Sequence, residues 1–297
     1  MVTCATLDAL AERRLFFKCE HLQKVGAFKF RGACNAVFSL SDAAAAHGVV
    51  THSSGNHAQA LALAARLRGI AAHIVMPRNA AAVKQRAVEG YGGRIIQCAP
   101  TLEAREETAA EVLAETGGVL VPPYDYAPVI AGQGTVLLEL LAQVADLDAV
   151  IAPVGGGGLV SGLCVAAELN PSLRVFAAEP LGADDAARSK AANQLFPQTD
   201  PHTIADGLLT SLGQLTWPLI RDRVERIITV SENEIVAAMR LAWERAKLLI
   251  EPSAAVAVAA VLSAEFKGLA GLTRVGVVLS GGNVDLGKLH WVEGLGD

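Results

Sequence analysis

The segment AVIAPVGGGGLVSGL, residues 149–163, joins an apolar run to a helical pattern through Gly155, Gly156, Gly157 and Gly158. Four consecutive glycines at such a junction cost chain entropy, which favours a functional role over a plain flexible turn. Successive backbone N–H groups at the start of a helix can hold a phosphate. No Gly-Lys-Ser/Thr follows, and residue 160 is valine, so neither a Walker motif nor a dinucleotide fingerprint fits.

The rest of the chain repeats this alternation of short apolar runs with helical patterns. Apolar runs that do not alternate with polar residues are typical of strands buried on both faces of a parallel sheet. The pattern therefore predicts an α/β fold, with a mostly parallel sheet and helices on both faces. The predicted strands cover residues 49–51, 72–76, 94–98, 119–121, 149–154, 175–178, 227–230 and 275–279.

The composition limits the class of protein. Of 297 residues, 52% are hydrophobic and 19% are charged, which indicates a globular core rather than disorder. The net charge of −5 gives no basic face for nucleic acid, and no apolar stretch is long enough to span a membrane. The five cysteines include no CxxC pair and no signal peptide is apparent, so we expect reduced thiols in the cytoplasm.

Two further strand ends carry unusual loops, and ligands of open α/β sheets bind at such ends. In THSSGNH, residues 51–57, hydroxyls and free N–H groups precede a helix and suit a carboxylate, although an ordinary helix cap is the alternative. In LSGGNVD, residues 279–285, Ser280 ends a strand and could contact a ligand, although a simple turn is the alternative.

A lysine in GAFKFRG, residues 26–32, is the remaining chemical signal. Lys29 lies between two phenylalanines, and desolvation by apolar neighbours lowers the pKa of an amine. A neutral lysine amine can form a Schiff base. The alternative is a surface lysine whose stem packs along apolar groups.

Taken in order, GAFKFRG, THSSGNH, GGGG and LSGGNVD resemble the serine/threonine dehydratase family of pyridoxal-phosphate (PLP) enzymes, of the tryptophan-synthase-β fold type. The resemblance covers nearly the whole chain and includes LFFKCE (15–20), IAGQGT (130–135), TIADG (203–207) and WERAKLLIEP (243–252). It implies fold type II with two doubly wound parallel-sheet domains. A large PLP-binding domain would comprise residues 1–39 and 126–297, and a small inserted domain residues 40–125.

The resemblance implies how PLP is bound. Lys29 would be the Schiff-base lysine, and the N–H groups of the four glycines would bind the phosphate. Asn56 would bond the 3-oxygen of the ring, and Ser280 would face the pyridine nitrogen. A neutral hydroxyl there makes the ring a weaker electron sink, which suits elimination and racemisation better than transamination.

The same resemblance implies how the substrate is bound. Lys29 and Ser54 would be the acid/base pair on opposite faces of the substrate Cα. Ser53, Ser54, Asn56 and His57 would contact the substrate, and Ser53, Asn56 and His57 would help to seat its carboxylate. The substrates implied are L-serine, D-serine and L-threonine.

Two accessory sites and a partner also follow from the resemblance. Mg²⁺, or Ca²⁺ or Mn²⁺, would bind Glu179, Asp185 and the backbone carbonyl of Ala183, because hard cations prefer oxygen ligands. A homodimer is expected, with no membrane or nucleic-acid partner. ATP would act as an effector at the dimer interface, through Lys24, Gln59, Tyr91, Lys247 and Asn283.

The implied activity is racemisation of serine together with β-elimination of L-serine to pyruvate and ammonia. Two departures from the family pattern bear on it. The chain starts near the first strand region without the usual leading helix, and Tyr124-Asp125 resembles threonine dehydratases. The alternatives are therefore an L-threonine/L-serine dehydratase without significant racemisation and, from another class, a non-catalytic nucleotide-binding protein or an inactive paralogue.

Overall fold

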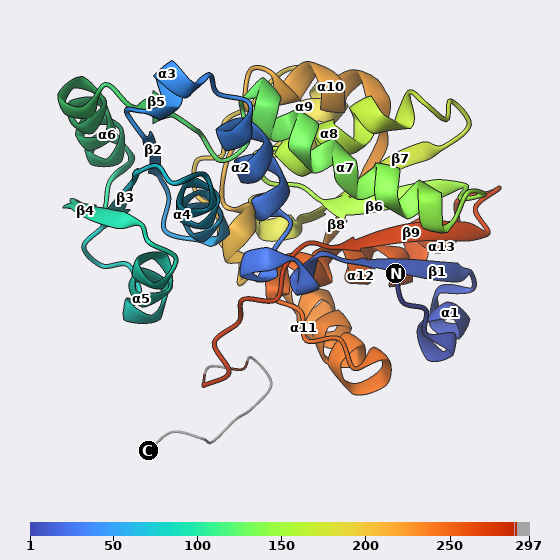
Figure 1. The fold of residues 1–297 in the computed structure, drawn as a ribbon. Helices are drawn as coiled ribbons and strands as arrows, with labels where there is room; N and C mark the ends of the chain where they lie inside the picture. Colours follow the sequence, from blue (N-terminus) through green and yellow to red (C-terminus); the bar gives the residue numbers. More distant parts are fainter. Residues whose placement is uncertain (288, 290–297) are drawn as a thin grey trace.

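A computed structural model describes residues 1–287 and 289, and its strands form two separate parallel sheets (Figure 1). The larger sheet has the order β1 (Arg14–Cys19), β9 (Arg274–Leu279), β6 (Ala149–Pro153), β7 (Arg174–Pro180) and β8 (Val224–Val230). The smaller sheet has the order β4 (Arg94–Cys98), β3 (Ala72–Pro77), β2 (Val49–His52) and β5 (Val119–Leu120).

Helices connect these strands, as parallel neighbours require. The α-helices are α1 (Ala5–Ala11), α2 (Lys29–Phe38), α3 (Asp42–Ala45), α4 (Asn56–Arg68), α5 (Ala82–Gly90), α6 (Leu102–Thr116), α7 (Ala127–Gln143), α8 (Gly158–Ala167), α9 (Asp185–Ala192), α10 (Thr216–Arg223), α11 (Glu232–Leu241), α12 (Pro252–Leu262) and α13 (Ala264–Lys267). Short helical turns are η1 (Glu20–Leu22), η2 (Lys24–Gly26), η3 (Leu181–Ala183), η4 (Asp206–Leu208) and the π-helical η5 (Ala242–Ala246).

The five-stranded sheet is covered on both faces. Along β6, Ile151 faces a core formed with α12, whereas Val150 faces a second core formed with α7 and α8. Both side chains are fully buried, so the strand has no polar face. This explains the continuous apolar run in the sequence.

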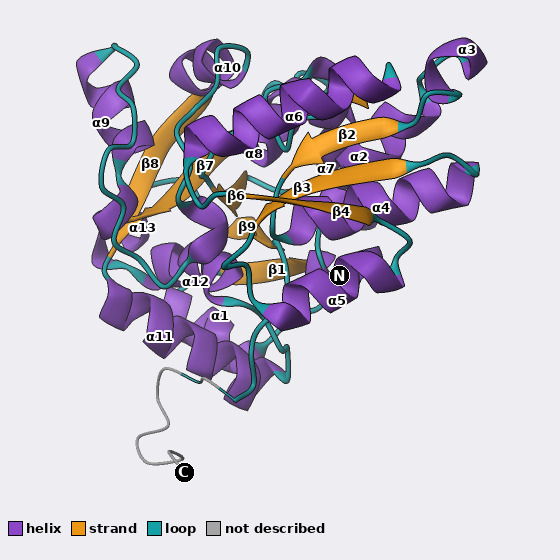
Figure 2. Ribbon diagram, turned by 90° about the vertical axis from the view of Figure 1, so that its left-hand side faces the viewer, coloured by secondary structure: helices purple, strands orange, loops and turns teal. Residues whose placement is uncertain are grey.

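The four-stranded sheet has the same arrangement on a smaller scale. Val49 faces a core with α2 and α4, whereas Val50 faces α6 on the opposite side of β2. Figure 2 shows α6 on one side of β2 and β3, with α4 and α5 on the other. α4 is buried from His57 to Ala65, so other elements pack on all sides of this helix and not on a single apolar face.

These observations confirm the predicted α/β fold with two parallel sheets. All eight predicted strands are present, but β1 was missed because its Lys18 is polar and yet buried. A short helix, α1, precedes β1. The strands of the smaller sheet lie between residues 49 and 120, while the boundaries at 40 and 125 stay a prediction.

Ser231 followed by Glu234 in the sequence predicts a capping box at the start of a helix that runs through Lys247. The capping box is confirmed, because the Ser231 and Glu234 side chains each bond the other residue's backbone N–H, but the helix is present only in part. The regular helix ends at Leu241, and the π-helical turn follows it. Lys247 then adopts a left-handed conformation with φ of 59°, which ends the segment.

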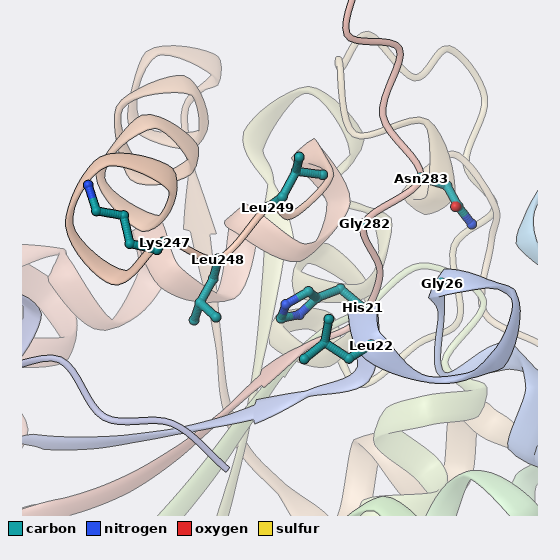
Figure 3. A pocket seen from close by; sticks show the side chains of 8 residues that line it. All are labelled: His21, Leu22, Gly26, Lys247, Leu248, Leu249, Gly282 and Asn283. Carbon is teal, nitrogen blue, oxygen red and sulfur yellow. The ribbon is translucent and has the colours of Figure 1, made fainter.

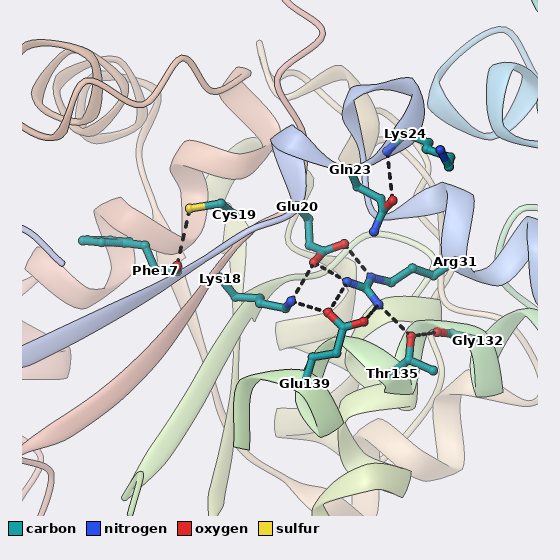
Figure 4. Close-up of polar contacts among 10 residues, drawn as sticks. All are labelled: Phe17, Lys18, Cys19, Glu20, Gln23, Lys24, Arg31, Gly132, Thr135 and Glu139. Atoms are coloured by element: carbon teal, nitrogen blue, oxygen red, sulfur yellow. Dashed lines mark hydrogen bonds and ion pairs between the residues drawn. The ribbon is translucent and has the colours of Figure 1, made fainter. Parts of the chain in front are cut away.

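A buried charge network fixes α2 to the larger sheet (Figure 4). Arg31 bonds Glu20 through Nε at 2.7 Å and through Nη2 at 2.9 Å. Arg31 also bonds Glu139 of α7 at 2.7 Å, and Lys18 of β1 bonds the same carboxylate at 2.5 Å. Because Glu20 and Lys18 are buried, losing one partner would leave an uncompensated charge, at a cost of about 3–5 kcal/mol. The network thereby positions the start of α2, where Lys29 lies.

Candidate active site

Lys29 is the first residue of α2 and follows a tight turn. Val25 and Gly26 both have positive φ values, 58° and 68°, and a Cβ at Gly26 would lie 2.7 Å from Asn283 Oδ1. The turn brings Lys29 against residues from the end of the chain, since Phe28 N donates to Ser280 O at 3.0 Å. Lys29 and Ser280, 251 positions apart in the sequence, therefore lie at one edge of the larger sheet.

The Lys29 amine is in a desolvated position. Its Nζ donates to Pro123 O at 2.7 Å and lies 5.2 Å from the centre of the Phe28 ring. Desolvation lowers the pKa of Lys29 to about 8, and the nearby Glu251 opposes this shift. A substantial fraction of the amine is therefore neutral near physiological pH, as a nucleophile or a base requires.

The glycine loop, residues 155–158, connects β6 to the first residue of α8. In the described chain, the N–H groups of Gly155, Gly156 and Gly157 have no hydrogen-bond acceptor. Gly157 has a φ of 87°, and a Cβ there would lie 2.8 Å from Thr216 Cβ. Free N–H donors at a helix start, on a backbone with no side chains, fit a phosphate.

Tyr124 covers this loop. A Cβ at Gly156 would lie 2.3 Å from the Tyr124 ring, and a Cβ at Gly158 would lie 2.9 Å from Tyr124 Cβ. Burial raises the pKa of the Tyr124 hydroxyl, so it is a neutral group. The aromatic ring therefore forms one wall beside the glycine loop.

The loop between β2 and α4 forms another part of the site. Ser53 N donates to Val75 O at 3.2 Å, and Ser53 and Ser54 are half-buried. His57 is buried, its Nε2 lies 2.9 Å from Val121 O, and desolvation lowers its pKa to about 3. His57 is therefore a neutral ring, and it can bind a carboxylate only through its backbone N–H in the first turn of α4.

Glu251 contacts this loop from the larger sheet and was not among the predicted site residues. Asn56 Nδ2 donates to Glu251 Oε1 at 3.0 Å, and Asn283 N donates to Oε2 at 2.9 Å. Asn283 Nδ2 also donates to Asn56 Oδ1 at 2.8 Å. Desolvation raises the pKa of Glu251 to about 7, with a further contribution from Asp206. Its position directly before the proline that starts α12 was the only signal in the sequence.

The predicted metal ligands lie together between β7 and α9. Glu179 is fully buried and accepts from the N–H groups of Ala186 and Ala187 at 3.0 and 2.8 Å. Desolvation raises the pKa of Glu179 to about 8 and that of Asp185 to about 6. Asp185 Oδ2 is buried without a donor, and Ala183 is buried nearby in η3.

This set of groups fits a hard cation in part. Residues 1–287 and 289 contain no cluster of three or more His, Cys, Asp or Glu side chains suited to a metal. A cation would therefore need the two carboxylates, the Ala183 carbonyl and water. The unpaired Asp185 oxygen is the observation that favours one.

The structure groups only some of the residues predicted for ATP (Figure 3). Lys247 and Asn283 line a pocket of about 320 Å³, together with His21, Leu22, Gly26, Leu248, Leu249 and Gly282. Lys24, Gln59 and Tyr91 do not line it. Figure 3 shows the Lys247 amine directed away from His21, and this amine bonds the Glu244 carbonyl at 2.7 Å.

Lys29, the glycine loop and the Asn56 loop all lie within the part of the chain that matches a known family of proteins. The family model for pyridoxal-phosphate-dependent enzymes matches residues 1–281. The chain belongs to this family. PLP is its cofactor, and membership favours an enzyme over a non-catalytic nucleotide-binding protein. In the described part of the chain, no helix is long and apolar enough to cross a membrane.

Among curated relatives of this PLP enzyme, serine racemase of Dictyostelium discoideum is 51% identical, over 97% of this chain and 90% of the relative. The β-hydroxyaspartate dehydratase of Paracoccus denitrificans is 53% identical, over 96% of this chain and 90% of the relative. The solved structure of maize serine racemase is 52% identical with a TM-score of 0.95, covering 96% of this chain and 88% of the other.

Proposed function

We propose that this PLP enzyme interconverts L- and D-serine and also eliminates water from L-serine to give pyruvate and ammonia. The observation that carries the proposal is the desolvated Lys29 amine, which has a pKa of about 8 and donates to the Pro123 carbonyl at 2.7 Å. The preceding residue, Phe28, bonds the Ser280 carbonyl through its backbone N–H. The serine racemases at about 50% identity support the substrate.

The groups that would hold PLP are on two sides of the site. Lys29 would bind its aldehyde, and the free N–H groups of the glycine loop would bind its phosphate. Asn56 would contact the 3-oxygen, and Ser280 would face the ring nitrogen. When bound, PLP withdraws electrons from the substrate Cα and so acidifies its proton.

The chain's own groups would then bind the substrate and move protons. The first-turn N–H groups of α4, with Ser53, Asn56 and His57, would seat the carboxylate. Lys29 would remove the Cα proton from L-serine. Ser54 would deliver a proton to the opposite face during racemisation, whereas elimination needs only that the β-hydroxyl leave with a proton.

A second candidate is a dehydratase without significant racemisation. It is favoured by Tyr124 and Asp125, and by a β-hydroxyaspartate dehydratase at 53% identity. L-threonine and 3-hydroxyaspartate, which both carry a β-hydroxyl, would then be substrates alongside L-serine.

The deciding experiment incubates the PLP-loaded protein with L-serine and measures D-serine and pyruvate in the same sample. Formation of both products supports the proposed function. Pyruvate without D-serine supports the dehydratase, and parallel reactions with L-threonine and 3-hydroxyaspartate then establish its preferred substrate. If L-serine gives no D-serine and none of the three substrates gives a 2-oxo acid, both functions are contradicted.

Three accessory features are also part of the proposal. Mg²⁺, Ca²⁺ or Mn²⁺ would bind Glu179, Asp185 and the Ala183 carbonyl, which would give the unpaired Asp185 oxygen a partner. The protein would form a homodimer in the cytoplasm. ATP would bind as an effector beside Lys247 and Asn283, with Lys24, Gln59 and Tyr91 contributing only if they approach the pocket on binding.

A further inference from the structure

The turn at residues 122–126, PPYDY, touches two parts of the candidate site. The Pro123 carbonyl accepts from Lys29, and the Tyr124 ring lies against Gly156. The next residue, Asp125, faces neither of these. Its carboxylate points to the loop before α10, which has no assigned role in the site.

Asp125 caps the first residues of α10. Its Oδ1 accepts from Leu215 N at 2.8 Å and from Thr216 N at 3.2 Å, and its Oδ2 accepts from Gln214 N at 3.0 Å. A carboxylate that accepts several N–H bonds at a helix start is well satisfied. A Cβ at Gly213 would lie 2.1 Å from Asp125 Cγ, so the glycine permits this close approach.

Thr216 connects this cap to the glycine loop. The side chain is fully buried, and its Oγ1 accepts from Gly213 N at 2.8 Å. The same hydroxyl donates to the Gly156 carbonyl at 2.9 Å. Asp125 therefore fixes Thr216, and Thr216 fixes the Gly156 carbonyl.

The orientation of that carbonyl determines where a neighbouring N–H points. The peptide between Gly156 and Gly157 is planar and trans, so the Gly157 N–H points opposite to the Gly156 carbonyl. The hydroxyl of Thr216 holds the carbonyl on its own side, and the N–H is directed to the other side, where the described chain offers no acceptor. Glycine peptides would otherwise rotate easily, because they lack Cβ restraints.

We infer that Asp125 and Thr216 are positioning residues that orient the Gly157 N–H toward the phosphate of PLP. The inference rests on the proposed phosphate site at the glycine loop. Both residues would act through the peptide between Gly156 and Gly157, which contacts the phosphate in this proposal, and not through a contact of their own with the cofactor. Their effect should therefore depend on the phosphate and not on the pyridoxal ring.

The test compares binding of PLP and of pyridoxal, which lacks the phosphate, to the apoprotein by equilibrium dialysis. Thr216→Val removes the hydroxyl but keeps the shape, and Thr216→Ser keeps the hydroxyl as the matched control. One hydrogen bond has a net value that corresponds to about 3- to 10-fold in a dissociation constant. We expect Thr216→Val to weaken PLP binding by this factor and to leave pyridoxal binding unchanged. Thr216→Ser should bind both like the wild type.

Asp125→Asn extends the test. The substitution places an amide nitrogen where Oδ2 of Asp125 accepts from Gln214 N, and an amide nitrogen cannot accept a hydrogen bond. It should weaken PLP binding in the same direction while pyridoxal binding stays constant, which also shows that the variant is folded. If both Thr216 variants weaken PLP equally, or if Thr216→Val binds PLP like the wild type, the inference is overturned and the phosphate site stands. If the wild type binds PLP no better than pyridoxal, the phosphate site itself is wrong.

Discussion

The side chains of Asn56 and Glu251, 195 residues apart in sequence, are joined by a hydrogen bond of 3.0 Å from Nδ2 to Oε1. Asn56 begins α4, which packs on the smaller sheet, and Glu251 precedes α12, which packs on the larger one. The bond therefore connects the two sheets beside the proposed cofactor. Desolvation raises the pKa of Glu251 to about 7, so this contact changes charge within the physiological range.

We expect this carboxyl to make stability depend on pH. Glu251 stays protonated in the folded state up to pH about 7, whereas a glutamate in the unfolded chain ionises near pH 4.3. The folded state therefore holds more protons in this window, and the contribution of Glu251 to stability is lost as the pH rises through about 7. Urea unfolding of wild type and Glu251→Gln should show the wild type losing up to about 3 kcal/mol relative to the variant between these pH values.

A surface substitution controls for the general effect of removing a carboxylate. Glu265 is half-exposed and pairs with Arg226 at 3.4 Å. Glu265→Gln should leave the pH profile of the wild type unchanged. If the free energy of unfolding changes equally with pH in wild type and Glu251→Gln, the Glu251 carboxyl titrates as it does in the unfolded chain.

The Lys29 amine should capture PLP with a pH dependence centred near 8. Only the neutral amine attacks an aldehyde, and desolvation lowers the pKa of Lys29 to about 8 from 10.5. The rate at which apoprotein binds PLP covalently should therefore rise through pH 8 and level off above it. Stopped-flow absorbance measures this rate, and a midpoint near 10 would show that the amine is fully hydrated.

Chelation should destabilise the protein if the Glu179 and Asp185 site holds a cation. An ion at 100 times its dissociation constant adds about 2.7 kcal/mol to the free energy of unfolding. Adding Mg²⁺ or Ca²⁺ to chelated protein should raise its melting temperature by several degrees, and Asp185→Asn should abolish this response. The control is Glu265→Gln, since Glu265 pairs with Arg226 and is not one of the predicted ligands. A wild-type melting temperature that changes with neither chelator nor added metal would rule out a functional metal site.

Ser54→Ala should separate the two proposed reactions. Racemisation needs a proton donor on the face opposite Lys29, whereas elimination does not. Loss of a general acid costs about 10²- to 10⁴-fold, so D-serine formation should fall by this factor while pyruvate formation continues. Initial rates of both products from L-serine measure the effect. Near-normal interconversion of the enantiomers by the variant would show that Ser54 is not the proton donor.

The sequence was sufficient for the architecture because the strands are buried on both faces. Val150 and Ile151 face opposite cores, so the strand is a continuous apolar run. A run of this kind predicts a strand without knowledge of the elements that pack on it. β1 escaped prediction because Lys18 is buried through its bond to Glu139 in α7, which no local pattern encodes. The ending of α11 was also unpredictable, since the π-helical turn and the left-handed Lys247 break a continuous helical pattern.

The residues of the candidate site also fall into two groups, those that the sequence indicated and those that it did not. The glycines and Lys29 stood out because their residue types are unusual in their surroundings. The roles of Glu251 and Asp125 were not predictable, because each role depends on a group distant in sequence: Asn56 for Glu251 and Thr216 for Asp125. The charge state of His57 also required the structure, since burial, with a contribution from Lys29, lowers the pKa of that ring.

The assignment of Lys29 as the PLP-binding lysine is the central claim, and one measurement tests it directly. The PLP-loaded protein is reduced with borohydride, digested, and mapped by mass spectrometry. We predict the phosphopyridoxyl group on the peptide that contains Lys29, and its loss in Lys29→Ala. A reduced adduct on another lysine, such as Lys18 or Lys24, in the wild type would contradict the account.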